Sequence, residues 1–285
     1  MDPLLPVLVV LALVWGSIWG SFLNVVVYRV PAGLSVVRPA SCCPRCSETL
    51  RWWQNIPVLG WALLGGRCWF CKEPISWRYP AVEATSAALV LAASMPWIGL
   101  GLSGELAWQV AVSGALLDQT LVLTLIGIAL IDADTFMIPD ALSLPLIIVG
   151  MVAAVAVGDA RGVSWMAAGA GALAAGAGLL LVQLGYAALS GREGLGTGDI
   201  KLLAAIAAWT GLASVPAVLL LAAVQGLLFS LGLAATSRGV LAEERGLASL
   251  RHLAVPFGPF LALAAVEWLL LHRQLAGPLE HLFGL

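Results

Sequence analysis

The chain has 285 residues, of which 61% are hydrophobic and only 11% are charged, and its formal net charge is -2. Ordinary soluble domains contain roughly 45 to 50% apolar and about 25% charged residues. The composition therefore predicts a polytopic membrane protein and excludes a separate soluble catalytic domain. The nearly neutral charge gives no indication of nucleic-acid binding.

The first apolar segment, Leu4 to Val27, predicts a retained membrane-spanning helix. It is longer than the apolar core of a secretory signal peptide, and Asp2 is the only charge before it. Seven of the 14 basic residues then follow between Tyr28 and Pro80. Because basic segments next to spans remain on the cytoplasmic side, we expect this loop to be cytoplasmic and the N-terminus to be periplasmic.

Further apolar segments predict the remaining spans. Residues 200–235 alone would form about 54 Å of helix at ~1.5 Å per residue, which exceeds the ~30 Å core of a bilayer. The turn residues Gly211 to Pro216 divide this segment in two. The predicted spans after the first are 81–97, 106–131, 141–157, 163–189, a short one from 200, one after 216, and 255–271. With eight spans, most basic residues outside the first loop are cytoplasmic, as the positive-inside rule favours; these are Arg192, Lys201, Arg238, Arg245 and Arg251.

Two acidic motifs stand at the ends of apolar segments: IDADTFMIPD, Ile131 to Asp140, and GLGTGDIK, Gly194 to Lys201. The predicted topology places Asp132 and Asp199 at the same membrane face. Paired carboxylates activate water when one is an ionised base and the other a protonated acid. The motifs alone fit solvated loop charges equally well. A further alternative is a cation transporter or channel whose acids form an ion site.

The residues around the two aspartates predict helix ends. The glycines between Gly194 and Gly198 permit backbone conformations closed to other residues and let an extended chain approach closely. Ile138 and Pro139 should end the helix that contains Asp132, because proline restricts the preceding residue and lacks an N–H donor. Two other acids, Asp118 and Glu267, lie within spans and should face the bundle interior or an aqueous cavity.

The chain resembles a known family in several motifs that follow one another in the family's order. They are SFLNVVVYRVP (21–31), two CxxC pairs, NIPVLGW (55–61), RYPAVE (78–83), IDADTFMIPD, GLGTGDIKL and VPFGPFLA (255–262). The family is that of the prepilin peptidases, which are bifunctional leader peptidases and N-methyltransferases. The resemblance covers nearly the whole chain.

The resemblance implies an aspartic intramembrane-type protease of the bacterial inner membrane. Such enzymes remove the basic leader of type IV prepilins and type II secretion pseudopilins, cutting after a glycine at the cytoplasmic face. They then methylate the new N-terminus with S-adenosylmethionine. The expected partners are these substrates and membrane lipid.

By motif position, the resemblance implies that Asp132 and Asp199 are catalytic, with Asp134 as the rival for the first role. Five residues are expected to support the site: Gly196, Gly198, Lys201, Asp134 and Glu83. The resemblance places the methyl donor in the loop from Tyr28 to Pro80, but the sequence identifies none of its contacts.

The same loop contains Cys43-Pro-Arg-Cys46 and Cys68-Trp-Phe-Cys71. Two CxxC pairs supply four thiolates for a tetrahedral structural zinc ion, which would fold a loop too small to have its own core. Two disulfides or four free thiols are the alternatives, and a cytoplasmic location argues against stable disulfides. Cys42 is either a spare thiol or a substitute ligand, and the sequence does not decide between these roles.

The predicted fold class is therefore an all-α polytopic membrane protein with about eight transmembrane helices and a small zinc-binding cytoplasmic loop. We expect three parts. They are a first transmembrane helix (1–27), a tetracysteine loop associated with methyl transfer (28–80) and a seven-helix aspartic peptidase domain (81–285).

Overall fold

The computed structural model describes residues 2–191, 194, 196–241 and 255–283. Within these ranges the regular elements are helices, and the β pairing consists of two isolated bridges, Cys42 with Thr49 and Arg67 with Pro74. The prediction of an all-α fold is confirmed. The chain divides into two compact units, Met1–Gly127 and Ile128–Leu285, which are taken in turn.

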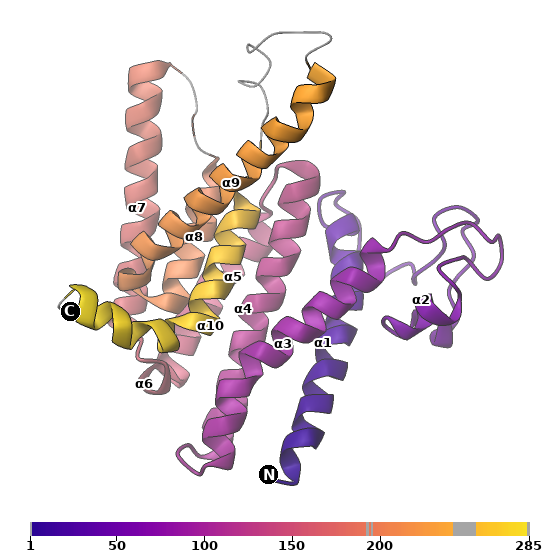
Figure 1. Cartoon of the computed structure of the whole chain (residues 1–285), viewed down its shortest axis with the longest axis horizontal. Coiled ribbons are helices and arrows are strands. Elements are labelled where there is room, and N and C mark those ends of the chain that lie inside the picture. Colours follow the sequence, from indigo (N-terminus) through magenta and orange to yellow (C-terminus); the bar gives the residue numbers. More distant parts are fainter. Residues whose placement is uncertain (1, 192–193, 195, 242–254, 284–285) are drawn as a thin grey trace. The chain divides into compact units, whose positions relative to one another are not determined.

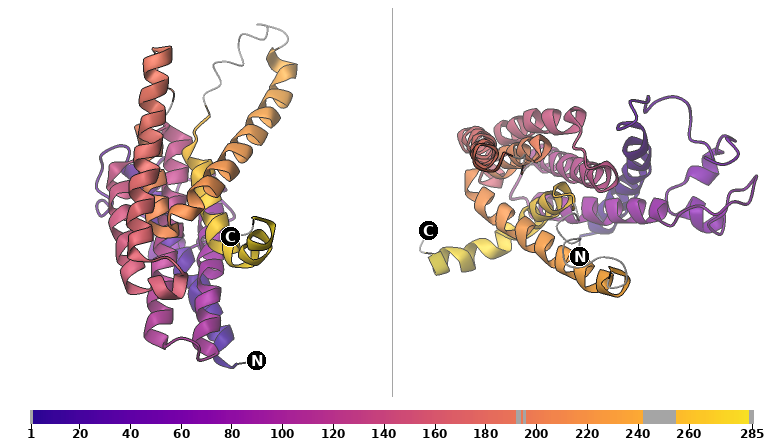
Figure 2. Two further views of the ribbon diagram at one scale, coloured as in Figure 1. Left: turned by 90° about the vertical axis from the view of Figure 1, so that its left-hand side faces the viewer. Right: turned by 90° about the horizontal axis from the view of Figure 1, so that it is seen from above.

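The first unit contains α1 (Leu4–Arg29), α3 (Arg78–Leu102) and the first part of α4 (Trp108–Thr135). Helices α1 and α3 run side by side (Figures 1 and 2). A Cβ atom added at Gly16 would lie 2.7 Å from Ala87 Cα, and one at Gly20 would lie 2.7 Å from Glu83 Cα. Small residues four positions apart thus let the two backbones approach closely. The loop between these helices holds η1 (Trp52–Asn55) and α2 (Leu59–Leu63).

The second unit begins with the last turns of α4. The helices that follow are α5 (Asp140–Ala156), α6 (Gly158–Arg161), α7 (Trp165–Ser190), α8 (Thr197–Thr210), η2 (Leu212–Ser214), α9 (Val215–Leu241) and α10 (Gly258–Phe283). Helix α8 is central, because every residue from Leu202 to Trp209 is buried and it packs against both α5 and α7 (Figure 2). A helix that is apolar on all sides is stable when it is covered on all sides. This burial fixes the position of the first turn of α8.

Within the described ranges, five helical segments are long and apolar enough to cross a membrane. They are α1, α3, α4, α7 and Leu212–Leu233, whereas α5 and Gly258–His272 are apolar but shorter. Large apolar side chains on the outside of these helices, such as Leu11 and Leu173, are exposed, as lipid-facing residues are. The described structure thus supports a polytopic membrane protein, and eight crossings stay a prediction.

The predicted helix breaks are confirmed. Helix α8 ends at Thr210, Gly211 has a φ of +78°, and α9 starts at Val215. Helix α4 ends at Thr135, and α5 starts at Asp140 directly after Pro139. Three basic residues used for the topology prediction lie outside the described residues: Arg192, Arg245 and Arg251.

The two acids predicted to face the bundle interior have buried or half-buried partners. Asp118 is 5% exposed and accepts a hydrogen bond of 2.7 Å from Nε1 of Trp97. Glu267 is half-buried and accepts one of 2.6 Å from Nε2 of Gln225. Both acids therefore stabilise contacts between helices, as an intramembrane carboxyl group requires.

Candidate active site

Two helix ends bring Asp132 and Asp199 to one cavity of about 660 Å³. Asp132 lies in the last turn of α4, and Asp199 lies in the first turn of α8. The cavity also has a charged wall with Asp140 and Lys201. Its apolar wall includes Phe136, Met137, Ile138 and Phe257. Carboxyl groups that are distant in the sequence thus share one water-accessible space.

Asp132 is 5% exposed and is held by the start of another helix. Its Oδ2 accepts a hydrogen bond of 3.0 Å from the backbone N–H of Gly258, the first residue of α10. A Cβ atom at position 258 would lie 2.6 Å from that oxygen, so the contact requires glycine. The N–H donor and the partial positive charge of a helix N-terminus both favour the ionised form of a carboxyl group. These two contacts partly offset the cost of burying the Asp132 carboxylate.

Asp199 is half-buried and behaves differently. Burial, followed by the negative charge of Asp132, raises the pKa of Asp199 from its ordinary value to about 6. A hydrogen bond from the backbone N–H of Gly196 to its carboxylate partly offsets this rise. Gly196 is the N-cap residue of α8, and an acid at the third helical position commonly reaches back to the N-cap N–H. Asp199 therefore binds a proton more readily than an ordinary aspartate.

The glycines before Asp199 are needed for space rather than for unusual backbone angles. Gly196 has ordinary extended angles, φ -70° and ψ 138°, and Gly198 does not have a positive φ. Neither of these two glycines therefore uses the wider range of backbone angles that glycine permits. A Cβ atom at Gly198 would lie 2.9 Å from Cβ of Ile138, and one at Gly196 would lie 3.1 Å from Oδ2 of Asp199. The missing side chains let the start of α8 pack closely at the cavity.

Lys201 also lies at this cavity, where its Nζ forms an ion pair of 2.6 Å with Oδ1 of Asp140 and links α8 to α5. Asp134 is exposed and does not line the cavity. Glu83 belongs to the first unit, where its Oε2 accepts a hydrogen bond of 2.6 Å from the Val58 N–H. Five predicted site residues therefore gather at one cavity: Asp132, Gly196, Gly198, Asp199 and Lys201.

Sequence reasoning assigned no role to Gly258. Its motif, VPFGPFLA, was noted only as part of a resemblance, although a glycine before Pro259 at the start of an apolar segment is typical of a helix start. The contact with Asp132 joins residues 126 positions apart. No local pattern specifies such a contact.

The four cysteines of the two CxxC pairs form a second cluster in the first unit. Their sulfur atoms all lie within 4.8 Å of one another, with 3.8 Å between Cys43 and Cys71 and 4.0 Å between Cys46 and Cys68. A tetrahedral zinc ion with bonds of ~2.3 Å separates its sulfur ligands by roughly 3.8 Å. All five cysteines are free thiols, and Cys42 is exposed and outside the cluster. The donor set and spacing fit a structural metal.

Each half of this cluster is the same small turn. In the first, the Cys43 N–H donates to Glu48 O and the Ser47 N–H donates to Cys43 O. In the second, the Cys68 N–H donates to Glu73 O and the Lys72 N–H donates to Cys68 O. Ser47 and Lys72, at the matching positions, both have a φ of 60°. Two equivalent turns thus present two thiols each, as paired metal-binding knuckles do.

The chain is similar to known proteins over most of its length. Residues 14–97 match the family model for the bacterial peptidase A24 N-terminal domain, and residues 120–231 match that of the type IV leader peptidase family. The chain is similar to the prepilin leader peptidase/N-methyltransferase of Neisseria gonorrhoeae, with 34% identity over 95% of this chain and 98% of the relative. A protein of the same name from Klebsiella pneumoniae is 40% identical over 73% of this chain and 90% of the relative. Another, from Burkholderia pseudomallei, is 37% identical over 88% of this chain and 81% of the relative. No solved structure matches the chain.

Proposed function

The chain belongs to the type IV leader peptidase family, and we propose that it cleaves the basic leader from type IV prepilins and type II secretion pseudopilins. After cleavage, it methylates the new N-terminus of the product. The observation that carries the proposal is the pair Asp132 and Asp199 in one cavity at two helix ends. The relatives reported above carry both activities in their name. Nothing in the comparisons favours the transporter alternative.

Cleavage uses the two carboxyl groups in different protonation states. Asp132, the carboxylate that accepts the Gly258 N–H, takes a proton from water as the water oxygen attacks the scissile carbonyl carbon. Asp199, with its raised pKa, gives its proton to the leaving nitrogen as the carbon–nitrogen bond breaks. The products are the leader and the shortened pilin, and no covalent intermediate forms.

The cavity suits the junction of a polar leader and an apolar helix. Its acidic side chains, Asp132, Asp140 and Asp199, lie near an apolar wall that includes Met137 and Phe257. A basic leader is attracted to the acidic groups, and an apolar helix buries surface against the wall. Gly196 and Gly198 leave room for an extended backbone at the scissile bond.

The cysteine cluster holds zinc in this proposal, since four thiolates at tetrahedral spacing are typical of structural zinc sites. Asp132 and Asp199 supply the acid and base groups, so the metal has a structural role in the loop. S-adenosylmethionine supplies the methyl group. The division into a first helix (1–27), a tetracysteine loop (28–80) and a peptidase domain (81–285) stays a prediction.

The proposed site faces the cytoplasm of a bacterial cell, with the N-terminus in the periplasm. Seven basic residues lie in the loop from Tyr28 to Pro80, and such loops remain in the cytoplasm. Cys42 is an exposed thiol in this loop and stands outside the metal cluster. A membrane-impermeant maleimide should therefore label Cys42 in inverted vesicles and not in intact spheroplasts. Labelling in intact spheroplasts would show that this loop lies on the periplasmic side, opposite to the proposed orientation.

The experiment that tests the function uses the purified chain in detergent and a prepilin that keeps its leader and apolar helix. Mass spectrometry should show loss of the leader, and with S-adenosylmethionine present it should also show one added methyl group on the product. A prepilin in which valine replaces the glycine before the scissile bond is the matched control and should stay intact. An unprocessed wild-type prepilin would refute the proposal.

A further inference from the structure

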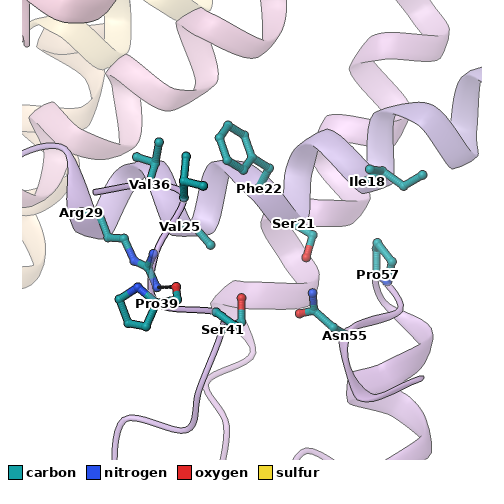
Figure 3. Close-up of a pocket in the computed structure, with 12 residues that line it drawn as sticks. Ile18, Ser21, Phe22, Val25, Arg29, Val36, Pro39, Ser41, Asn55 and Pro57 are labelled. Carbon is teal, nitrogen blue, oxygen red and sulfur yellow. Dashed lines mark hydrogen bonds between the residues drawn. The ribbon is translucent and has the colours of Figure 1, made fainter. Parts of the chain in front are cut away.

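A second cavity, of about 340 Å³, lies entirely in the first unit between α1 and the loop that precedes α2 (Figure 3). This volume is within the range of roughly 300 to 1,000 Å³ that is usual for small-molecule sites. All its lining residues fall between Ile18 and Pro57, inside the segment that matches the N-terminal domain model. The leader-peptidase model covers residues 120–231 and therefore leaves this cavity outside the peptidase segment.

A fixed cation stands at one end of this cavity. The Arg29 guanidinium donates a hydrogen bond of 3.0 Å to the carbonyl oxygen of Ser35. It donates a second one, of 2.8 Å, to the carbonyl oxygen of Pro39 (Figure 3). These contacts satisfy part of its five N–H donors without neutralising its charge. The positive charge therefore remains to attract an anionic group of a ligand.

The other end is polar and has a buried acid behind it. Ser21 and Asn55 lie there, away from Arg29 (Figure 3). Ser21 hydrogen-bonds to the carboxylate of Glu83, which is 8% exposed and also accepts the Val58 N–H at 2.6 Å. A carboxylate placed behind a cavity wall favours positive charge in that part of the cavity.

Apolar side chains form much of the remaining wall. Val25 and Val36 lie between the two polar ends (Figure 3), and Phe22 and Pro57 also line the cavity. Ser41 adds a hydroxyl group on the loop side. The cavity thus combines an apolar surface, several neutral polar groups and opposite charges at its two ends.

We propose that this cavity binds S-adenosylmethionine, so that it is the methyl-donor site of this chain. The inference rests on the proposed methyl transfer. The ligand's carboxylate suits Arg29, and its ammonium and sulfonium charges suit the end backed by Glu83. The adenine ring suits the apolar wall, and the ribose hydroxyls suit Ser41 and Asn55. In the cavity with the aspartates, the cation among the described lining residues is Lys201, and it is already paired with Asp140 at 2.6 Å.

The test measures binding of radiolabelled S-adenosylmethionine to purified protein in detergent, with no peptide substrate present. Ser41→Tyr fills the cavity and should weaken binding at least about tenfold, which is ~1.4 kcal/mol. The matched control is Thr49→Tyr, which places the same side chain at an exposed position on the other side of the Cys42–Thr49 bridge. The control should keep the wild-type dissociation constant. Zinc content and the thermal midpoint show whether each variant is folded.

A second variant covers the case in which Ser41→Tyr does not fold. Asn55→Ala removes an amide without adding volume, and Asn55 is exposed, so the fold should tolerate the change. It should weaken binding by roughly threefold to tenfold, as the loss of one hydrogen bond does. If the folded variants bind S-adenosylmethionine with wild-type affinity, the cavity assignment is overturned. A cavity that is filled by lipid would give this result. Absence of binding to the wild type would instead refute the methyl-transfer part of the proposed function.

Discussion

The two polar centres of this chain are assembled in opposite ways. The cysteine cluster consists of two short turns, each closed by its own backbone hydrogen bonds and each contributing two thiols. The aspartate site consists of helix ends, and its hydrogen bond between Asp132 and Gly258 joins residues 126 positions apart. The first centre depends on local turns. The second depends on how the helices of the second unit pack.

This difference predicts which perturbations each centre tolerates. A small loop has little apolar core, so without a metal it loses most of what would stabilise its fold. The aspartate site is fixed by α8, whose residues from Leu202 to Trp209 are all buried. Changes in the loop should therefore affect zinc content and methyl-donor binding, whereas changes at helix starts should affect cleavage.

The largest expected effect is that of metal removal. Cys68→Ser, or a strong chelator, should release the zinc ion and leave the loop open to proteolysis, because structural zinc sites contribute about 10 to 16 kcal/mol in small domains. Zinc analysis and limited proteolysis measure the result. Cys42→Ser is the matched control, since Cys42 lies outside the cluster, and it should keep its zinc. Equal zinc loss in both variants would show that the ligand set is wrong.

The next effect tests the contact between α10 and Asp132. Gly258→Ala places a Cβ atom 2.6 Å from Oδ2 of Asp132, so the carboxylate must move. Cleavage should fall by about 10²-fold, as is typical when an acid–base group is displaced, while zinc content stays unchanged. Gly226→Ala is the matched control, because its Cβ atom would meet only the Phe260 ring, at 3.4 Å. Similar cleavage rates for the two variants would contradict the assigned role of Gly258.

The pH dependence of cleavage separates the two acids. The pKa of Asp199 is raised to about 6, so the proton is present below that pH and is lost above it. If the reaction needs protonated Asp199, its kcat/KM should be highest below about pH 6. Above that pH, on the basic limb of the profile, kcat/KM should fall roughly tenfold for each pH unit. Asp140→Asn should leave the midpoint of this limb unchanged, because burial and then the Asp132 charge raise the pKa of Asp199. A rate that rises with pH through this range would contradict the assignment.

The smallest effect concerns the ion pair between Lys201 and Asp140. Its side chains are 37% and 56% exposed, so solvent screens the attraction and the pair should contribute at most about 1 kcal/mol. Lys201→Met and Asp140→Asn should each lower the thermal midpoint slightly and slow cleavage by only a few fold. The double variant should be little worse than either single variant, because both remove the same contact. Additive losses would show that the two residues act separately.

Local patterns in the sequence predicted much of this structure. The glycine and proline positions predicted the breaks at Gly211 and Pro139, and the two CxxC spacings predicted a four-thiol cluster. Such features depend on neighbouring residues, so one sequence suffices to predict them.

Contacts between distant elements were not predictable in this way. The role of Gly258 and the need for space at Gly198, beside Ile138, arise from helix packing. The supporting role expected for Glu83 stays a prediction, and the structure shows the Val58 N–H as a partner of its carboxylate. A carboxyl group in an apolar segment indicates that a partner exists, but its identity depends on the tertiary fold.

The most direct test of the central claim is prepilin cleavage in detergent by the wild type and by Asp132→Asn, Asp199→Asn and Asp134→Asn. We expect the first two variants to lose cleavage by roughly 10²-fold or more. Asp134→Asn should keep most of the wild-type rate, because Asp134 is exposed and does not line the cavity. Loss of cleavage in Asp134→Asn with retention in Asp132→Asn would contradict the assignment of the catalytic pair.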